Sequence, residues 1–230
     1  ETIENRIAKV QKQAVTGGDK QAAKLAGLLI RYRDLLQQGK NARTLPLANQ
    51  EEEQMARDLF LLTNKPVLYV CNVDENAAQN GNNYTRQVAE ALLPDNEPCL
   101  IVAGRIESEI AQLDTYQERQ MFLEDLGLKE SGVSRLIKAA FRLLHLETYF
   151  TAGPMEVKAW TYIKGTKAPQ AAGLIHSDFE HGFIRAEVIK FEDYIRYGSE
   201  AACREAGKLA VEGKNYVVQD GDIMHFLFSR

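Results

Sequence analysis

The residues best suited to chemistry follow an apolar run in KPVLYVCNVDE, residues 65–75, where the run ends at Asn72. Ligands of open α/β sheets bind just beyond the carboxyl ends of the strands. An Asn side chain carries a donor and an acceptor on one planar group, which suits the edge of a purine. A carboxylate at Glu75 would accept from ring N–H or amino groups of the same base. The stretch therefore predicts a nucleotide-base site that includes Asn72, Val73 and Glu75.

A second apolar run, residues 99–103, leads through Gly104 into a helical pattern. The order strand, helix, strand, helix is typical of a parallel α/β sheet, in which both strand ends meet at one edge. Ala103 and Gly104 are therefore expected to form a small wall, with backbone N–H groups, beside the base. The pattern N-x-x-E is short, and an ordinary solvated strand-to-helix loop is the alternative interpretation.

The sequence shows no means of holding phosphates. It contains no G-x-x-x-x-G-K-[ST], no G-x-G-x-x-G and no D-x-x-G that would position a γ-phosphate and its Mg²⁺. We therefore name no catalytic residue and expect the chain by itself to be inactive in triphosphate hydrolysis. We also name no metal ligand, because His176 and His181 are five residues apart, off the i,i+4 spacing of a helical metal site.

Charge is concentrated at the N-terminus. The net charge of the chain is −4, yet residues 1–43 contain nine basic and four acidic residues, a surplus of five positive charges. A basic helical surface of this kind is either a solvated face or an electrostatic contact for nucleic acid. The residues predicted to contact RNA phosphates are Lys9, Lys12, Lys20, Lys24, Arg31 and Arg33.

The elements that would position these residues follow from hydrophobic periodicity. Ile3, Ile7 and Val10 predict one helix, and leucines between residues 25 and 36 predict a second. Glycines with Asp19 as a cap separate the two, which indicates an antiparallel, coiled-coil-like hairpin. Further helices are expected at residues 49–63, 84–93, 106–113, 115–128 and 131–146, with buried strands at 67–71 and 99–103.

The pattern of apolar and polar residues changes beyond residue 147. Residues 156–165 predict a strand, residues 168–183 a helix with Pro169 near its first turn, and residues 184–198 alternate between apolar and polar. Asp220-Gly221 predicts a turn before the last apolar stretch. This is the pattern of a small mixed α+β module.

Bulk properties favour a cytoplasmic protein with no membrane partner. No apolar stretch approaches the ~20 residues that a transmembrane helix needs. The three cysteines, Cys71, Cys99 and Cys203, are an odd number without paired spacing, which is typical of reduced, buried thiols.

A family resemblance rests on long segments of the sequence. Residues 148–194, TYFTAGPMEVKAWTYIKGTKAPQAAGLIHSDFEHGFIRAEVIKFEDY, and 205–228, EAGKLAVEGKNYVVQDGDIMHFLF, closely resemble the C-terminal TGS domain of the YchF family, the Obg-like ATPases. KPVLYVCNVDE and the basic hairpin resemble the same family. The similarity covers essentially the whole chain.

The resemblance implies three parts. They are a helical coiled-coil insertion and hinge (1–65), the C-terminal half of a P-loop-type parallel α/β domain (66–146) and a ubiquitin-like β-grasp TGS domain (147–230). In that family the GTPase signature N-K-x-D becomes N-x-x-E and ATP is favoured over GTP. Asn72 and Glu75 occupy the first and last positions of the altered motif, and the resemblance implies that Asn72 recognises the base.

The resemblance also implies partners. Family members bind ribosomes and use ATP, and to a lesser degree GTP, with Mg²⁺. This chain lacks the P-loop, which is expected in a missing N-terminal segment. The resulting hypothesis is part of a ribosome-associated ATPase that contacts ribosomal RNA and a purine nucleotide. The alternative is a non-enzymatic RNA- or ribosome-binding adaptor.

Overall fold

The computed structural model describes residues 2–17, 19–95, 97–153 and 156–229. The chain divides into two compact units, Glu1–Gly132 and Val133–Arg230, which we call the first and second unit. The first contains a two-stranded sheet and the second a five-stranded sheet. The mixed α/β character predicted from the sequence is therefore present. The three-part division at residues 65 and 146 remains a prediction.

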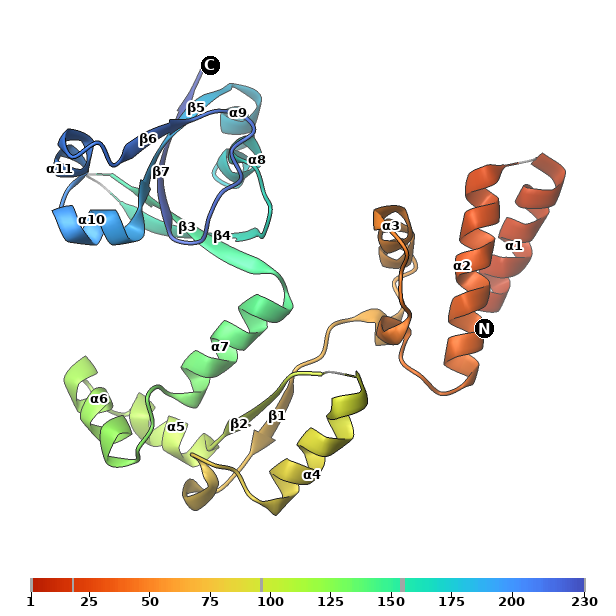
Figure 1. Cartoon of the computed structure of the whole chain (residues 1–230), viewed down its shortest axis with the longest axis horizontal. Coiled ribbons are helices and arrows are strands. Elements are labelled where there is room, and N and C mark those ends of the chain that lie inside the picture. The colour runs from red at the N-terminus through yellow and green to blue at the C-terminus, as the bar shows by residue number, and fades with distance from the viewer. Residues whose placement is uncertain (1, 18, 96, 154–155, 230) are drawn as a thin grey trace. The chain divides into compact units, whose positions relative to one another are not determined.

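The first unit begins with helices and continues into alternating strands and helices (Figure 1). Its elements are α1 (Thr2–Gly17), α2 (Lys20–Gln37), η1 (Ala42–Thr44), α3 (Gln50–Asp58), η2 (Leu62–Asn64), β1 (Tyr69–Asn72), η3 (Glu75–Ala77), α4 (Asn83–Leu92), η4 (Leu93–Asp95), β2 (Cys99–Val102), α5 (Gly104–Ala111) and α6 (Tyr116–Asp125).

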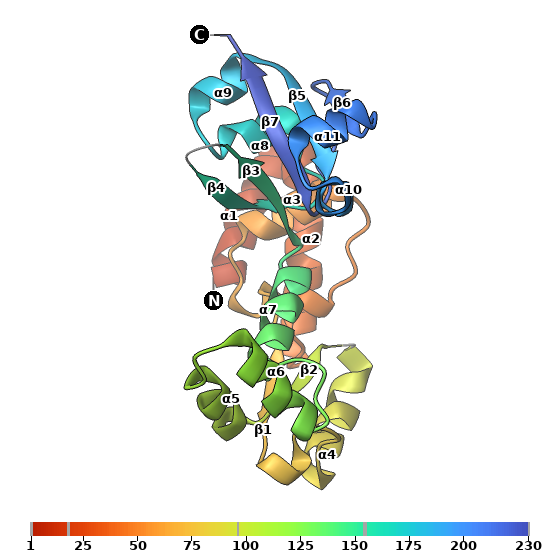
Figure 2. The same cartoon turned by 90° about the vertical axis from the view of Figure 1, so that its left-hand side faces the viewer.

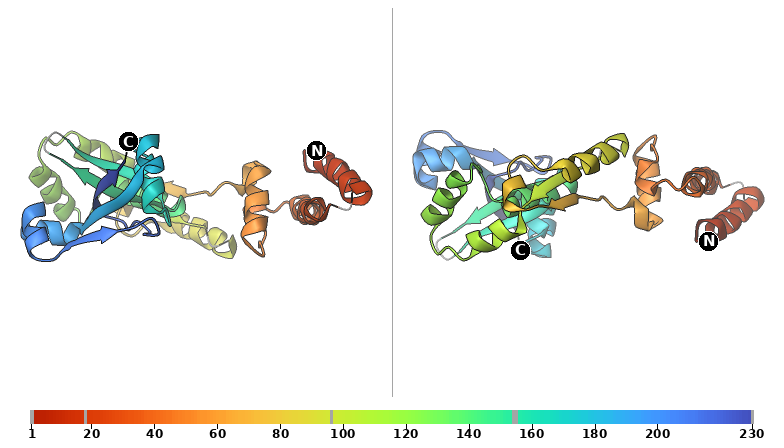
Figure 3. Two further views of the ribbon diagram at one scale, coloured as in Figure 1. Left: turned by 90° about the horizontal axis from the view of Figure 1, so that it is seen from above. Right: turned by 90° about the horizontal axis from the view of Figure 1, so that it is seen from below.

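Helices α1 and α2 form a hairpin, and Figure 3 shows α2 nearly end-on with α1, in red, beside it. Asp19 caps α2, since its carboxylate accepts from the backbone N–H groups of Gln21 and Ala22. The core of this part contains Ile3, Ile7, Leu28, Leu29 and Tyr32, and α3 contributes Ala56. Each helix is too short to be stable alone, and the two therefore bury their apolar faces against each other.

Strands β1 and β2 are parallel, as predicted, with Asn72 opposite Val102. Parallel pairing carries the carboxyl ends of both strands to the same edge of the sheet. Behind that edge lies a small core of Ala78, Ala103, Ile106, Ile110 and Leu123. The sheet edge that should bear the base site is thus anchored by α5 and α6.

Two predictions for the first unit were wrong in detail. The helix expected over residues 49–63 ends at Asp58, because Phe60 adopts a left-handed backbone with φ of 52°. The strand expected at residues 67–71 spans Tyr69–Asn72 and is not covered on both faces, since Val70 is 45% exposed. Within the described residues β1 pairs only with β2, so much of it faces outward.

The second unit is a helix followed by a mixed sheet with four short helices. Its elements are α7 (Gly132–Leu143), β3 (Leu146–Ala152), β4 (Val157–Ile163), α8 (Ala168–Gly173), α9 (Ser177–His181), β5 (Phe183–Lys190), α10 (Phe191–Tyr197), α11 (Glu200–Glu205), β6 (Leu209–Glu212) and β7 (Asp222–Phe228).

The five strands lie in the order β4-β3-β7-β5-β6, and β7 pairs with β3 in parallel and with β5 antiparallel. Helices α8 and α9 pack against β5 and β7 (Figure 2). The core beneath them includes Tyr149, Val188, Met224 and Phe226, with alanines of α8 on the helical side. The last strand of the chain is therefore the central one.

Three details of this unit differ from the prediction. The expected helix over residues 168–183 is split into α8 and α9, because His176 is extended and its ring Nδ1 accepts from the N–H of Asp178. The alternating stretch at residues 184–198 is β5 followed by α10. Strand β3 spans Leu146–Ala152, a stretch for which no strand was predicted and of which only Leu146 fell within the expected helix. The turn at Asp220-Gly221 is confirmed, with a φ of 83° at Gly221.

A buried carboxylate connects the start of β7 to its neighbours. Asp222 is fully buried, and its oxygens accept from Lys190 Nζ at 2.6 Å, Tyr216 OH at 2.6 Å and the Gln219 N–H at 2.9 Å. Burial alone would lower the pKa of Lys190, but the bonds to Asp222 and Tyr216 outweigh it and raise that pKa. The network fixes the loop that precedes the central strand.

We expect this unit to lose stability above about pH 10, the ordinary pKa of tyrosine. Burial, followed by the hydrogen bond to Glu147, raises the pKa of Tyr162, and burial raises that of Tyr149. Both phenols stay protonated in the folded state, so their stabilising effect is complete below pH 10 and disappears as pH rises further. Melting temperatures from about pH 8 to about pH 11.5 measure this loss.

The matched variant is Tyr162→Phe, which should lose less stability over the same range of pH. Tyr116→Phe is the control, because Tyr116 is 74% exposed. Equal alkaline slopes for the parent protein and Tyr162→Phe would contradict the role of this buried phenol.

Candidate nucleotide-base site and basic helical surface

The base site predicted from the sequence is built on a hydrogen bond between two strand ends. Asn72 is the last residue of β1, and its side-chain Oδ1 accepts from the backbone N–H of Gly104 at 2.9 Å. Gly104 opens α5, so its N–H is one of the donors that a helix leaves without a partner inside the helix. Asn72 satisfies this donor and is held in one orientation.

This bond leaves the side-chain NH₂ group of Asn72 as the part that can hydrogen-bond to a ligand. The oxygen is engaged by Gly104, while the residue itself is exposed. An amide N–H₂ donates two hydrogen bonds and suits an acceptor such as a purine ring nitrogen. A β-carbon at Gly104 would lie 3.1 Å from Asn72 Oδ1, so the glycine permits this close approach.

The remaining predicted residues take different positions around this bond. Ala103 is buried beside Ile106, and Val73 packs against the same core while its N–H donates to Val102. Asp74 accepts from the N–H of Ala77 and caps η3. In the part of the chain that the structure describes, exposed Glu75 makes no side-chain hydrogen bond. The structure thus joins Asn72 to Gly104, next to Ala103, and within the described residues no hydrogen bond links Glu75 to them.

Two of the three cysteines, Cys71 and Cys99, lie on the same pair of strands, and Cys203 lies in α11. Cys203 is buried as predicted, whereas Cys71 and Cys99 are half-buried, with their sulfur atoms 3.6 Å apart. Burial, together with the Cys71 neighbour, raises the pKa of the Cys99 thiol. That thiol therefore favours the protonated form, which is the less reactive one.

The predicted basic surface divides into two groups. Lys9, Lys12 and Lys20 are exposed on α1 and at the start of α2. Lys12 also interacts with another group of the chain. The other three cations form ion pairs: Lys24 Nζ lies 2.6 Å from Glu51, Arg31 lies 2.8 Å from Glu52, and Arg33 lies 2.7 Å from Asp34. The sequence pattern gave no sign of these ion pairs.

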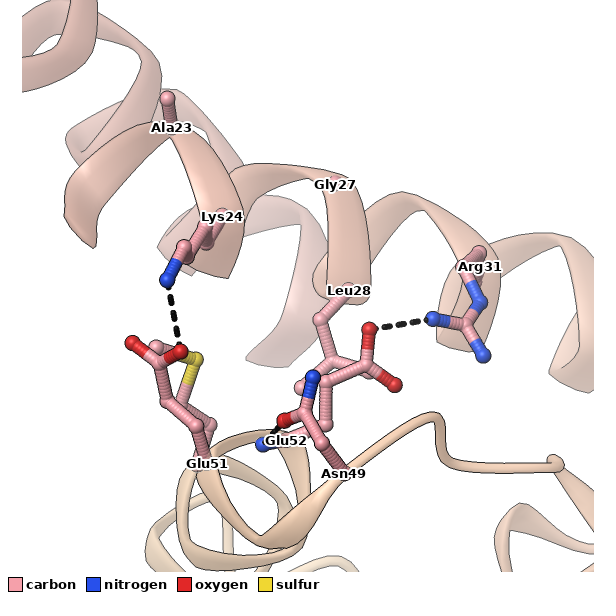
Figure 4. Close-up of a pocket in the computed structure, with 9 residues that line it drawn as sticks. Ala23, Lys24, Gly27, Leu28, Arg31, Asn49, Glu51 and Glu52 are labelled. Atoms are coloured by element: carbon pink, nitrogen blue, oxygen red, sulfur yellow. Dashed lines mark hydrogen bonds and ion pairs between the residues drawn. The ribbon is translucent and has the colours of Figure 1, made fainter. Parts of the chain in front are cut away.

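Figure 4 shows the groove in which two of these pairs lie. It has a volume of about 340 Å³ and is bordered by α2 on one side and the beginning of α3 on the other. Leu28 and Met55 contribute its apolar lining, and Lys24, Arg31, Glu51 and Glu52 its charges. Its cations are therefore already neutralised from within the chain.

Neither a metal centre nor a membrane span is present in the described part of the chain. Among those residues no group of three or more His, Cys, Asp or Glu side chains is placed to hold a metal ion. None of their helices is long and apolar enough to cross a membrane.

Known proteins resemble the chain along its whole length. The family model YchF-GTPase_C, described as "Protein of unknown function (DUF933)", matches residues 146–229. A ribosome-binding ATPase YchF of Bacillus subtilis is 48% identical over 231 residues, covering 100% of this chain and 62% of that protein. The chain belongs to the YchF and Obg-like ATPase family.

Other members of the family are similar to the chain over nearly its whole length. An Obg-like ATPase 1 of Rattus norvegicus is 40% identical over 227 residues, which cover 97% of this chain and 57% of that protein. The structure of the Schizosaccharomyces pombe YchF GTPase superposes with a TM-score of 0.86 at 30% identity, covering 98% of this chain and 61% of that one. The chain thus spans less than two thirds of the length of these family members.

The sequence of this YchF-family chain predicts a base site at Asn72 but does not reveal the contacts around that residue. The Asn72–Gly104 bond joins residues 32 positions apart, and only the parallel pairing of β1 and β2 brings them together. The cap made by Asp74 had a local signal, because Asp commonly precedes a helical turn.

Proposed function

We propose that this chain supplies the purine-base half of an ATP site in a ribosome-associated, YchF-type ATPase. The observation that carries the proposal is the bond between Asn72 Oδ1 and the Gly104 N–H, which orients an exposed amide at the carboxyl end of β1. Ligands of open α/β sheets bind at this edge. Relatives named ribosome-binding ATPase YchF support the same assignment.

The fit to the nucleotide is partial. The Asn72 amide and the small wall of Ala103 and Gly104 suit an adenine base, and the N-x-x-E motif favours ATP over GTP. No described cluster of acidic side chains suits Mg²⁺. We therefore assign the phosphates and Mg²⁺ to a P-loop segment outside this sequence, and we assign no hydrolytic step to this chain.

The second part of the proposal concerns RNA. The α1–α2 hairpin carries the basic surplus, and we propose that its exposed lysines contact ribosomal RNA phosphates. We also propose that residues 147–230 are a TGS domain of the β-grasp type. The mixed sheet with α8 and α9 packed against it supports that assignment.

A charge-reversal experiment tests the RNA contact. Lys9→Glu with Lys20→Glu changes two exposed lysines without breaking the ion pairs between α2 and α3. A phosphate contact releases counterions when it forms, so we expect the variant's ribosome binding to weaken about 10- to 100-fold at low salt and to depend less steeply on salt. Co-sedimentation with ribosomes across a salt series measures both quantities.

Lys129→Glu is the control, since it makes the same kind of charge change on an exposed residue of the same unit. Circular dichroism verifies that all variants keep their helices. Equal sedimentation of the double variant and the parent at every salt concentration would show that the basic surface is only a solvated face.

The second candidate is a non-enzymatic RNA- or ribosome-binding adaptor. The missing phosphate-binding motifs favour it, because this sequence has the basic hairpin but no cradle for a triphosphate. Both candidates should bind RNA, and they differ in one property. If the adaptor hypothesis is right, replacing Asn72 should not change ATP binding by a longer protein that contains this chain.

A further inference from the structure

The groove between α2 and α3 places carboxylates where the proposed RNA contact needs phosphates. Lys24 Nζ donates to Glu51 Oε2 at 2.6 Å, and Arg31 Nη1 donates to Glu52 Oε1 at 2.8 Å (Figure 4). Arg31 also donates to the backbone carbonyl of Pro46. Two of the six cations predicted for RNA thus already have carboxylate partners on α3.

The beginning of α3 is built to keep these carboxylates in place. Asn49 caps the helix by accepting from the Glu52 N–H, and Glu52 in turn accepts from the N–H of Ala48. The Ala48 bond and then the Arg31 bond lower the pKa of Glu52, so its charged form is favoured. Acidic residues in a first turn are also stabilised by the helix dipole.

The ion pairs are accessible enough to be exchanged. The side chains of Lys24 and Glu51 are 59% and 40% exposed, and those of Arg31 and Glu52 are 40% and 23% exposed. Ion pairs between exposed groups contribute little to stability. An incoming phosphate can therefore compete for the same cations without breaking a buried contact.

We propose that the first turn of α3 is an internal competitor of RNA, which masks the α2 half of the basic surface until phosphates displace Glu51 and Glu52. The inference rests on the RNA contact proposed above. It separates Lys9 and Lys20, which are exposed, from Lys24 and Arg31, which become available only when α3 releases them.

The experiment removes the competing charges and keeps the side-chain shapes. Glu51→Gln with Glu52→Gln should bind a labelled poly(U) oligonucleotide about three- to tenfold more tightly at low salt. The logarithmic salt dependence should steepen by about 1.4, which is about 0.7 for each of two further phosphates neutralised on a single strand. Fluorescence anisotropy over a salt series measures both.

Glu53→Gln is the matched control. Glu53 lies in the same first turn, and in the described part of the chain no ion pair joins it to a cation of the hairpin. This control makes half the charge change of the double variant, so Glu51→Gln and Glu52→Gln are also measured singly. Each should exceed Glu53→Gln, whose effect should stay below about twofold.

A second background separates masking from general charge. When Lys24→Gln and Arg31→Gln are already present, removing the Glu51 and Glu52 charges should no longer improve binding. An improvement that persists in this background would overturn the inference. Equal binding of the Glu51, Glu52 and Glu53 variants would also overturn it, provided that the parent binds poly(U) with a normal salt dependence. If no variant and no parent binds RNA at any salt, the proposed RNA contact is wrong and the masking with it.

Discussion

Asp222→Ala is expected to lower the free energy of unfolding of the second unit by about 2–4 kcal/mol. Asp222 is completely buried and accepts three hydrogen bonds, from Lys190, Tyr216 and Gln219. Its removal leaves those donors without their acceptor. The Lys190 side chain is 51% exposed and can turn to water, which keeps the loss below that of a fully buried pair.

The neighbouring aspartate provides the control. Asp220 is exposed, and its Oδ1 accepts a bond from the Thr148 N–H at 2.8 Å. Asp220→Ala should therefore cost only about 1 kcal/mol. Urea unfolding followed by tryptophan fluorescence reports on this unit, since Trp160 is the one tryptophan of the chain. Equal losses for the two variants would show that burial of Asp222 does not matter.

The second large effect concerns ATP binding by a longer protein that joins this chain to a phosphate-binding segment. Asn72→Ala should weaken ATP binding by about 1–3 kcal/mol, the cost of leaving a polar partner unpaired. The alanine removes both the oxygen that Gly104 uses and the amide that would face the base. Isothermal titration with ATP measures the change.

Asn72→Asp separates these two roles. An aspartate keeps an oxygen for the Gly104 N–H but has no donor for a purine ring nitrogen. We expect it to bind ATP as weakly as the alanine variant while the Gly104 amide keeps its NMR chemical shift. Asn76→Ala is the control, because Asn76 is an exposed residue of η3. ATP binding by Asn72→Asp at the strength of the parent would show that the amide does not read the base.

Local signals in the sequence were sufficient for most elements. The Asp19 cap and the glycine that follows α6 each depend on residues close together in the chain. The helix over residues 168–183 was predicted whole because histidine is not among the usual capping residues. The ring of His176 nevertheless caps α9 and divides that helix.

The site depended on contacts that no local pattern contains. Asn72 was predicted as a site residue because its type and position at a strand end suit a base. Its partner Gly104 could be named as a neighbour, but the bond between them requires the parallel pairing of two strands. The Lys24–Glu51 and Arg31–Glu52 pairs join residues 27 and 21 positions apart through packing of α3 on α2, so a charge count alone treated both cations as available.

The position of β7 has a consequence for how the second unit folds. The last strand of the chain lies between β3 and β5, so the sheet has no centre until the final residues are present. Contacts between residues distant in sequence make folding slow, because a long loop must close before they form. During synthesis, β3 and β4 leave the ribosome as an isolated hairpin, and such a hairpin is at best marginally stable in water. Folding of this unit is therefore completed only after translation of its C-terminus, and until then its apolar strands are open to mispairing.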